Sequence, residues 1–291
     1  MRKNVPVFVR TLAMTVLVTM VAATAGSAGT PGRIVSLNVC VDQILVDLVA
    51  RERIAALSYL ATDPLTAVHP ERATGSKTIK GSAEEVVALA PDLVIAGQYS
   101  TPATVDILRR LGLRIEVVPM PATVADVARL IRTLAGLVGE PARGEALVIE
   151  MEGRISAAVS TLRPDAAALR PSAIVYQVND FVSTGGDLAA DALALAGFRN
   201  IAIDLVHGRG RKVSVEALVA APPDLLVLAG APTTYRTAVA DNLRHPALAR
   251  IAASRPRIVI DWPLLLCGTH HIAEAVERLV RARSDLAAVR R

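Results

Sequence analysis

The segment Ser82-Ala83-Glu84-Glu85-Val86-Val87-Ala88-Leu89-Ala90-Pro91-Asp92-Leu93 recurs later in the chain as Ser214-Val215-Glu216-Ala217-Leu218-Val219-Ala220-Ala221-Pro222-Pro223-Asp224-Leu225. The copies share Ser, Glu, Val, Ala, Pro, Asp and Leu at the same offsets, and an apolar run follows each, at 94–97 and 226–230. Pro ends a helix and a short apolar run is typical of a buried parallel strand, so each copy predicts a helix followed by a strand. The repeat therefore predicts two related lobes, which commonly enclose a ligand cleft.

The rest of the chain also alternates between strand and helix patterns. Apolar residues recur at helical spacing over 141–162, between the two copies, and predict a connecting helix on the order of 30 Å long. We therefore expect an α/β protein with two Rossmann-like lobes, each built on a parallel sheet, joined by a single long backbone helix, with the cleft between the lobes. The expected boundaries are 33–140 for the N-terminal lobe, 141–163 for the helix and 170–291 for the C-terminal lobe. The expected strands are 33–37, 54–59, 114–118, 173–177 and 257–260, and the further expected helices are 124–138, 187–196 and 272–288.

The first 28 residues are expected to be a cleaved signal peptide. Basic residues precede an apolar stretch from Leu12 to Ala25, with small residues at Ala23, Ala25 and Ala28, as in secretory signals. The alternative is an uncleaved anchor, for which the apolar run is short. We therefore expect a periplasmic protein. The segment 1–30 holds three basic and no acidic residues, so the formal charge of +5 falls to about +2 without it. Such a charge gives no indication of nucleic-acid binding.

Two cysteines, Cys40 and Cys267, lie near opposite ends of the expected lobes. Export permits a disulfide between them. The alternative, which the sequence favours, is that they are two small buried apolar residues, since nothing in the sequence brings them within bridging distance. No Cys/His cluster has zinc spacing, so no resident metal or cofactor is expected.

In its motifs and their order, the chain resembles the periplasmic binding proteins of ABC importers for iron–siderophore complexes, haem and cobalamin. The marks are the opening Arg33-Ile34-Val35-Ser36-Leu37-Asn38, both repeat copies and the ending with Asp261-Trp262. The resemblance covers essentially the whole chain after the signal. It implies two lobes on one backbone helix, no catalytic residues, a monomer, and a metal chelate as the ligand.

Glu84 and Glu216 occupy the same place in the two copies. On the residues alone, each is a carboxylate in a first helical turn, where the helix dipole favours negative charge. The resemblance implies that each docks into an arginine pocket of the permease in the inner membrane. Glu85 is the alternative in the first copy, but it is also the expected capping-box partner of Ser82.

The cleft residues are expected in loops at the carboxyl ends of strands. Trp262, the only tryptophan, follows the last strand; a lone Trp is commonly a core residue, but its place beside Asp261 resembles the cobalamin-binding branch of the family. Phe181 matches a family cleft aromatic more loosely. Tyr59 and Tyr99 follow strands of the first lobe and could stack on, or ligate, a flat ligand. These five residues and Arg211 are the expected ligand-binding set.

The chain also departs from the cobalamin branch, which has several cleft tryptophans. Where that branch has Trp before the second repeat copy, this chain has a basic cluster of Arg209, Arg211 and Lys212, either a solvated loop or a clamp for an anionic ligand. His270 and His271 are adjacent and cannot share a helical face, so we expect a surface or capping role rather than joint ligation. The alternative is that one of them contacts haem iron as an axial ligand.

The leading expectation is a binding protein that delivers a ferric siderophore to an ABC importer. Cobalamin and haem are the alternatives within the class. An exported α/β hydrolase is a competitor from another class, although the sequence has no Gly-x-Ser-x-Gly elbow and no phosphate-binding glycine loop. A structural or sensing module on the same scaffold is a third interpretation.

Overall fold

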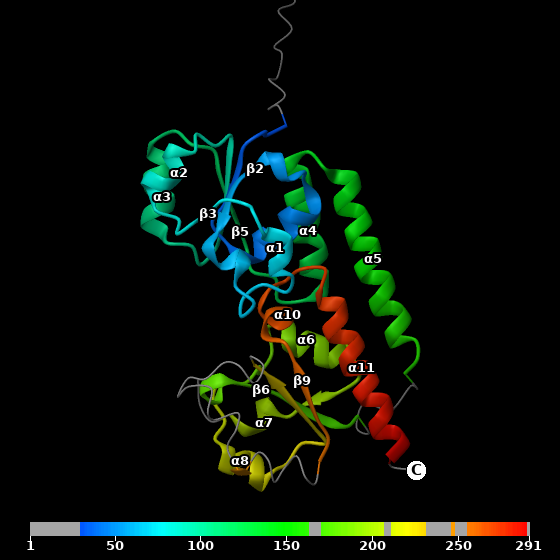
Figure 1. Cartoon of the computed structure of the whole chain (residues 1–291). Helices are drawn as coiled ribbons and strands as arrows, with labels where there is room; N and C mark the ends of the chain where they lie inside the picture. Colours follow the sequence, from blue (N-terminus) through cyan, green and yellow to red (C-terminus); the bar gives the residue numbers. More distant parts are fainter. Residues whose placement is uncertain (1–29, 163–169, 207–210, 231–245, 248–254, 290–291) are drawn as a thin grey trace, which may run out of the picture.

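The computed structural model describes residues 30–162, 170–206, 211–230, 246–247 and 255–289, in two lobes with a long helix beside them (Figure 1). The expected signal peptide and Arg209 lie outside these residues. The N-terminal lobe has a parallel sheet in the order β3-β2-β1-β4-β5. Its elements are β1 (Ile34–Ser36), α1 (Val39–Leu48), β2 (Ile54–Ser58), β3 (Thr78–Ile79), α2 (Ala83–Ala88), β4 (Leu93–Gly97), α3 (Pro102–Arg110), β5 (Ile115–Val118) and α4 (Val124–Val138).

The C-terminal lobe repeats the plan with a parallel sheet in the order β7-β6-β8-β9. The helix α5 (Pro141–Val159) comes before it in the chain. The elements of this lobe are β6 (Ser172–Gln177), α6 (Leu188–Leu195), β7 (Arg199–Asn200), α7 (Ala202–Leu205), α8 (Val215–Ala220), β8 (Leu225–Ala229), β9 (Arg257–Ile260), α10 (Trp262–Leu266) and α11 (Ile272–Val289). The predicted fold class is confirmed, whereas the three domain boundaries stay predictions.

The repeated motif does the same structural work in both lobes. Ser82 and Ser214 cap α2 and α8, each accepting a hydrogen bond from a backbone N–H three residues on. The repeated aspartates fix the start of the first strand of each sheet: Asp92 accepts from the N–H of Arg33 at 2.9 Å and Asp224 from that of Ser172 at 2.8 Å. In both copies the shared Ser therefore caps the helix of the repeat, and the shared Asp binds the backbone at the start of the first strand of the sheet.

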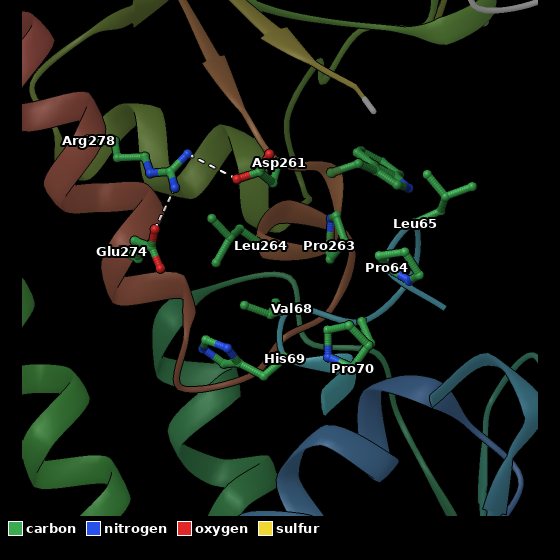
Figure 2. A pocket seen from close by; sticks show the side chains of 12 residues that line it. Pro64, Leu65, Val68, His69, Pro70, Asp261, Pro263, Leu264, Glu274 and Arg278 are labelled. Atoms are coloured by element: carbon green, nitrogen blue, oxygen red, sulfur yellow. Dashed lines mark hydrogen bonds and ion pairs between the residues drawn. The ribbon is translucent and has the colours of Figure 1, made fainter. Parts of the chain in front are cut away.

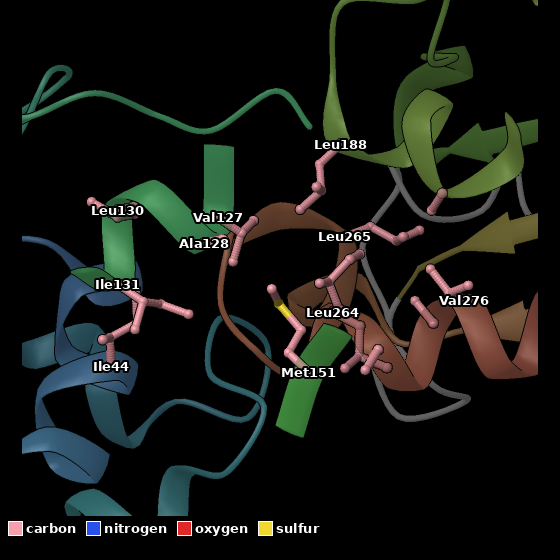
Figure 3. Close-up of a cluster of buried hydrophobic side chains, with 14 of the residues drawn as sticks. Ile44, Val127, Ala128, Leu130, Ile131, Met151, Leu188, Leu264, Leu265 and Val276 are labelled. Carbon is pink, nitrogen blue, oxygen red and sulfur yellow. The ribbon is translucent and has the colours of Figure 1, made fainter. Parts of the chain in front are cut away.

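The helix α5 is fastened to both lobes. On one side, Arg132 of α4 forms a two-point pair with Glu145 at 2.7 and 2.9 Å. On the other, Arg154 forms such a pair with Glu277 of α11 at 2.8 and 2.9 Å. Figure 3 shows Met151 of α5 among buried apolar side chains that come from both lobes. Because one continuous core includes residues of both lobes, we infer that they move little relative to each other.

The two cysteines form a disulfide, with Cα atoms 5.0 Å apart. The preference for two unbridged apolar residues was therefore wrong. Cys40 lies in the first turn of α1 and Cys267 directly follows α10, so the bond links the lobes across their interface. The sequence could not show this, because the approach depends on how the lobes face each other.

Among the described residues, no helix combines the length and apolar character that crossing a membrane requires.

Candidate functional site: the cleft between the lobes

A cavity of about 310 Å³ lies between the lobes. The N-terminal lobe lines it with residues that include Gln98, Tyr99 and Met120, and the C-terminal lobe with Gln177, Asp187, Arg211 and Trp262. Gln98 directly follows β4, Met120 lies just beyond β5, and Gln177 is the last residue of β6. The site is therefore built where parallel strands of both sheets end, which is where α/β proteins commonly bind ligands.

Trp262 is the central side chain of the cleft. It lines the cavity above and two neighbouring ones, of about 260 and 300 Å³. It also packs against the main hydrophobic core, so the core and cleft interpretations both apply to it. Its ring stands at the first position of α10, where Asp261 is the preceding residue and Pro263 the next. A half-buried indole held in this way offers a fixed apolar surface to a ligand.

The smaller of these cavities, of about 260 Å³, is shown in Figure 2. Arg278 of α11 points between two carboxylates, pairing with Asp261 at 3.1 Å and Glu274 at 2.6 Å. The opposite wall comes from the segment 64–70 of the N-terminal lobe and includes His69. The expected site residue Asp261 thus lines the cleft, but its charge is already paired.

The structure brings together four of the six expected ligand-binding residues: Tyr99, Arg211, Asp261 and Trp262. Tyr59 and Phe181 line none of the three cavities around Trp262. Tyr59 is exposed at the start of a 3-10 turn that follows β2, and Phe181 packs under the ammonium of Lys212, 4.9 Å from the ring centre. A position directly after a strand does not determine whether the side chain lines a cavity.

Several lining residues were missed by the sequence analysis. Gln98 and Gln177 add two carboxamides to the central cavity, and Asp187, the cap of α6, adds a carboxylate. The position of the two glutamines at strand ends could have predicted that they line the cleft. They were overlooked because their side chains carry no charge.

The cleft carries no excess positive charge among its described residues. Arg211 donates to the Asp187 carboxylate at 2.8 Å and to the carbonyl oxygen of Gly185 at 3.1 Å. Arg278 is paired as described. The charged groups that line the three cavities, His69 aside, are two arginines against four carboxylates: Arg211, Arg278, Asp63, Asp187, Asp261 and Glu274.

The expected surface role of His270 and His271 was wrong. Both are buried, at 8% exposure, and their Nε2 atoms lie 3.3 and 3.8 Å from Oδ2 of Asp47. The helical-face argument failed because both residues come before α11, in a turn that directs adjacent side chains the same way. Burial lowers the pKa of His271 to about 3, and its neighbour His270 acts in the same direction.

Glu84 and Glu216 are both exposed, in the first turns of α2 and α8. Glu85 instead completes the capping box, accepting from the backbone N–H of Ser82 at 3.0 Å, as the alternative for it predicted. Hydrogen bonds from its own backbone N–H and from the Ser82 hydroxyl lower the pKa of Glu84, which keeps this carboxylate ionised.

Comparison with known proteins agrees with this architecture. Residues 34–264 match the family described as periplasmic binding protein, and the chain belongs to that family. A cobalamin-binding protein of Halobacterium salinarum is 27% identical over 263 residues, which cover 88% of this chain and 69% of that protein.

Two solved structures show the same fold. The periplasmic heme-binding protein RhuT from Roseiflexus sp. RS-1 has a TM-score of 0.71 and 27% identity, covering 88% of this chain and 98% of that one. A protein of an ABC-type Fe3+-hydroxamate transport system from Saccharomonospora viridis has a TM-score of 0.63 and 22% identity, covering 88% and 93%. The chain is thus a periplasmic binding protein, and the two relatives that it matches at 27% identity are a cobalamin-binding and a heme-binding protein.

Proposed function

We propose that this protein captures a cobalamin in the cleft around Trp262 and delivers it to an ABC importer permease in the inner membrane. It acts in the periplasm as a monomer and a binder, not as an enzyme. The proposal replaces the ferric siderophore, the leading expectation from the sequence, with cobalamin, which was one of the alternatives. The observation that carries it is the charge of the cleft.

An anionic ligand needs unpaired cations, because burying an uncompensated charge is costly. Among the described residues that line the three cavities, Arg211 and Arg278 are both paired with carboxylates, and the carboxylates outnumber them. A ferric siderophore with carboxylate groups, or haem with two propionates, would add negative charge to this cleft. A cobalamin, whose periphery is made mostly of neutral amides, would not.

The polar groups of the central cavity suit the same ligand. Gln98 and Gln177 each present a carboxamide that can donate and accept, which matches amides on the ligand. Trp262 and Tyr99 supply aromatic surface for a large macrocycle, and Tyr99 is 76% exposed. The resemblance of Asp261-Trp262 to the cobalamin branch and the cobalamin-binding relative support the same cargo.

A second candidate cargo, haem, is favoured by one observation. The phenol of Tyr99 stands at the cavity wall, and phenolate can serve as an axial ligand of haem iron. Haem would use that phenol, whereas a corrinoid would use only the ring face, so Tyr99→Phe separates the two. Affinity for cobalamin is expected to be unchanged in this variant, and affinity for haem would fall at least tenfold.

Docking to the permease is assigned to Glu84 and Glu216, one on each lobe. An exposed valine follows each glutamate by one helical turn, Val87 at 43% and Val219 at 50% exposure. The two faces therefore repeat the same pair, a carboxylate beside a small apolar patch. Such a surface fits an arginine pocket with an apolar rim.

Uptake of labelled cobalamin tests the docking assignment. The double variant Glu84→Ala/Glu216→Ala is expected to lose most uptake while it binds cobalamin as the wild type does. The matched control is Glu150→Ala/Glu152→Ala, which removes two exposed carboxylates from α5. Normal uptake by the first variant, or equal loss in both, would contradict docking through these glutamates.

A further inference from the structure

Within the described part of the chain, one cluster of metal-ligating side chains lies outside the cleft. Asp47, His270 and His271 each offer a ligand atom, and these atoms lie within 4.8 Å of one another. The residues are almost wholly buried, at 9%, 8% and 8% exposure. Nothing in the binding of a large cargo or in docking to a permease uses them.

We propose that Asp47, His270 and His271 form a binding site for one divalent transition-metal ion, best suited to Zn²⁺, which bridges the two lobes. Two imidazoles and a carboxylate are a ligand set that zinc commonly adopts, with water in the fourth position. Alkaline-earth ions prefer sites made of oxygen ligands alone, so the two imidazoles select against them.

The spacing of the ligand atoms fits zinc. Ligands at about 2.0–2.2 Å from a tetrahedral ion lie about 3.3–3.6 Å from one another. The distance from Asp47 Oδ2 to Nε2 of His270 is 3.3 Å, and to Nε2 of His271 it is 3.8 Å. Small rotations of the side chains would therefore complete the site without movement of the backbone.

The hydrogen bonding of the cluster also points to a missing partner. Oδ2 of Asp47 is buried and makes no hydrogen bond of regular geometry among the residues that the structure describes, although Nε2 of His270 lies 3.3 Å from it, and Nδ1 of His270 has no hydrogen-bond partner among these residues. Buried polar atoms rarely lack a partner, and a bound ion is one way in which such an atom is satisfied. A cation on Oδ2 would therefore satisfy the carboxylate oxygen.

The surroundings hold the carboxylate in place for such an ion. Arg72 pairs with Oδ1 of Asp47, and this fixes the carboxylate while leaving Oδ2 toward the histidines. The ring of His69 packs edge-on against His271, with centroids 4.7 Å apart, and His69 also lines a cleft cavity. His69 thus separates the cluster from the cleft, and its own Nδ1 is 3.1 Å from Glu71.

The cluster stands next to the disulfide. Asp47 is two helical turns beyond Cys40 on α1, and the histidines follow Cys267 by three and four residues. Residues two turns apart share a helix face. One face of α1 therefore carries two links to the same turn of the C-terminal lobe, a covalent bond and the proposed metal bridge. The ion would be a resident ion that links the two lobes, not the cargo.

Titration of the metal-free protein, purified without a histidine tag, tests the site. We expect one Zn²⁺ per chain by calorimetry, a rise in melting temperature with Zn²⁺, and intense visible absorption with Co²⁺, typical of tetrahedral coordination. In His270→Gln and in His271→Gln we expect affinity for Zn²⁺ to fall at least tenfold. The matched control His69→Gln, which removes a neighbouring imidazole, is expected to keep binding within a few-fold.

Two results would overturn the proposal: no saturable binding of Zn²⁺ or Co²⁺ by the wild type, or undiminished binding by folded His270→Gln/His271→Gln. If those variants do not fold, X-ray absorption of the wild-type zinc complex decides. Two imidazoles in the first shell of the metal would support the site, and a shell of oxygen atoms alone would overturn it.

Discussion

Removal of the disulfide between Cys40 and Cys267 is predicted to destabilise the protein strongly. The bond closes a loop with a sequence separation of 227 residues. In the chain-entropy model, loss of a bond that closes a loop of this length lowers the free energy of unfolding by about 5 kcal/mol. For a chain of this size, about 2–4 °C of melting temperature corresponds to each kcal/mol, so Cys40→Ala/Cys267→Ala should melt on the order of 10–20 °C lower.

The assay is thermal unfolding followed by circular dichroism, with and without a thiol reductant. The reductant is expected to lower the melting temperature of the wild type toward that of the double variant and to leave the double variant unchanged. A double variant that melts within about 3 °C of the wild type would refute the reasoning. It would mean that the rest of the interface already holds the lobes together.

Two further changes test the packing and the buried charge. Gly144→Ala would place a Cβ 2.3 Å from that of Ala135 and should lower the free energy of unfolding in urea by about 1–3 kcal/mol. The control Gly153→Ala, where a Cβ meets no atom within 4 Å, should be neutral or stabilising. Equal effects of the two changes would contradict the close contact between α4 and α5. Burial raises the pKa of Asp42 from 3.8 to about 7, so between these pH values the folded carboxyl keeps its proton while the unfolded one releases it. As the pH rises from 3.8 to about 7, the stability of the wild type should therefore fall relative to that of Asp42→Asn, by up to about 1.4 kcal/mol per pH unit. A stability difference that does not depend on pH would contradict this reasoning.

Local patterns in the sequence predicted most of the fold. The helix over 124–138 was predicted with the bounds that α4 has, because apolar spacing can be read from neighbouring residues. Less visible were β3 and β7, each two residues long, and α10, which has five. Elements so short carry too few residues for a periodicity to show.

The site was predicted only in part, because its lining depends on how the two lobes are oriented relative to each other. Trp262 and Tyr99 were found from their places past strands, whereas the same argument named Tyr59 and Phe181, which line none of the three cavities around Trp262. Arg211 pairs with Asp187, 24 positions away, and Arg278 pairs with Asp261, 17 positions away, so the sequence did not show that these two arginines have carboxylate partners. The disulfide and the Asp47–His270–His271 cluster also join segments distant in sequence.

The most direct test of the proposed cargo is calorimetric titration of the protein with a cobalamin, a ferric siderophore and haem, in wild type and in Trp262→Ala. The proposal predicts saturable one-to-one binding of the cobalamin, at least tenfold tighter than that of the other two, and its loss in Trp262→Ala. Binding of the ferric siderophore or of haem with no heat from cobalamin would contradict it, and so would cobalamin binding that Trp262→Ala leaves unchanged.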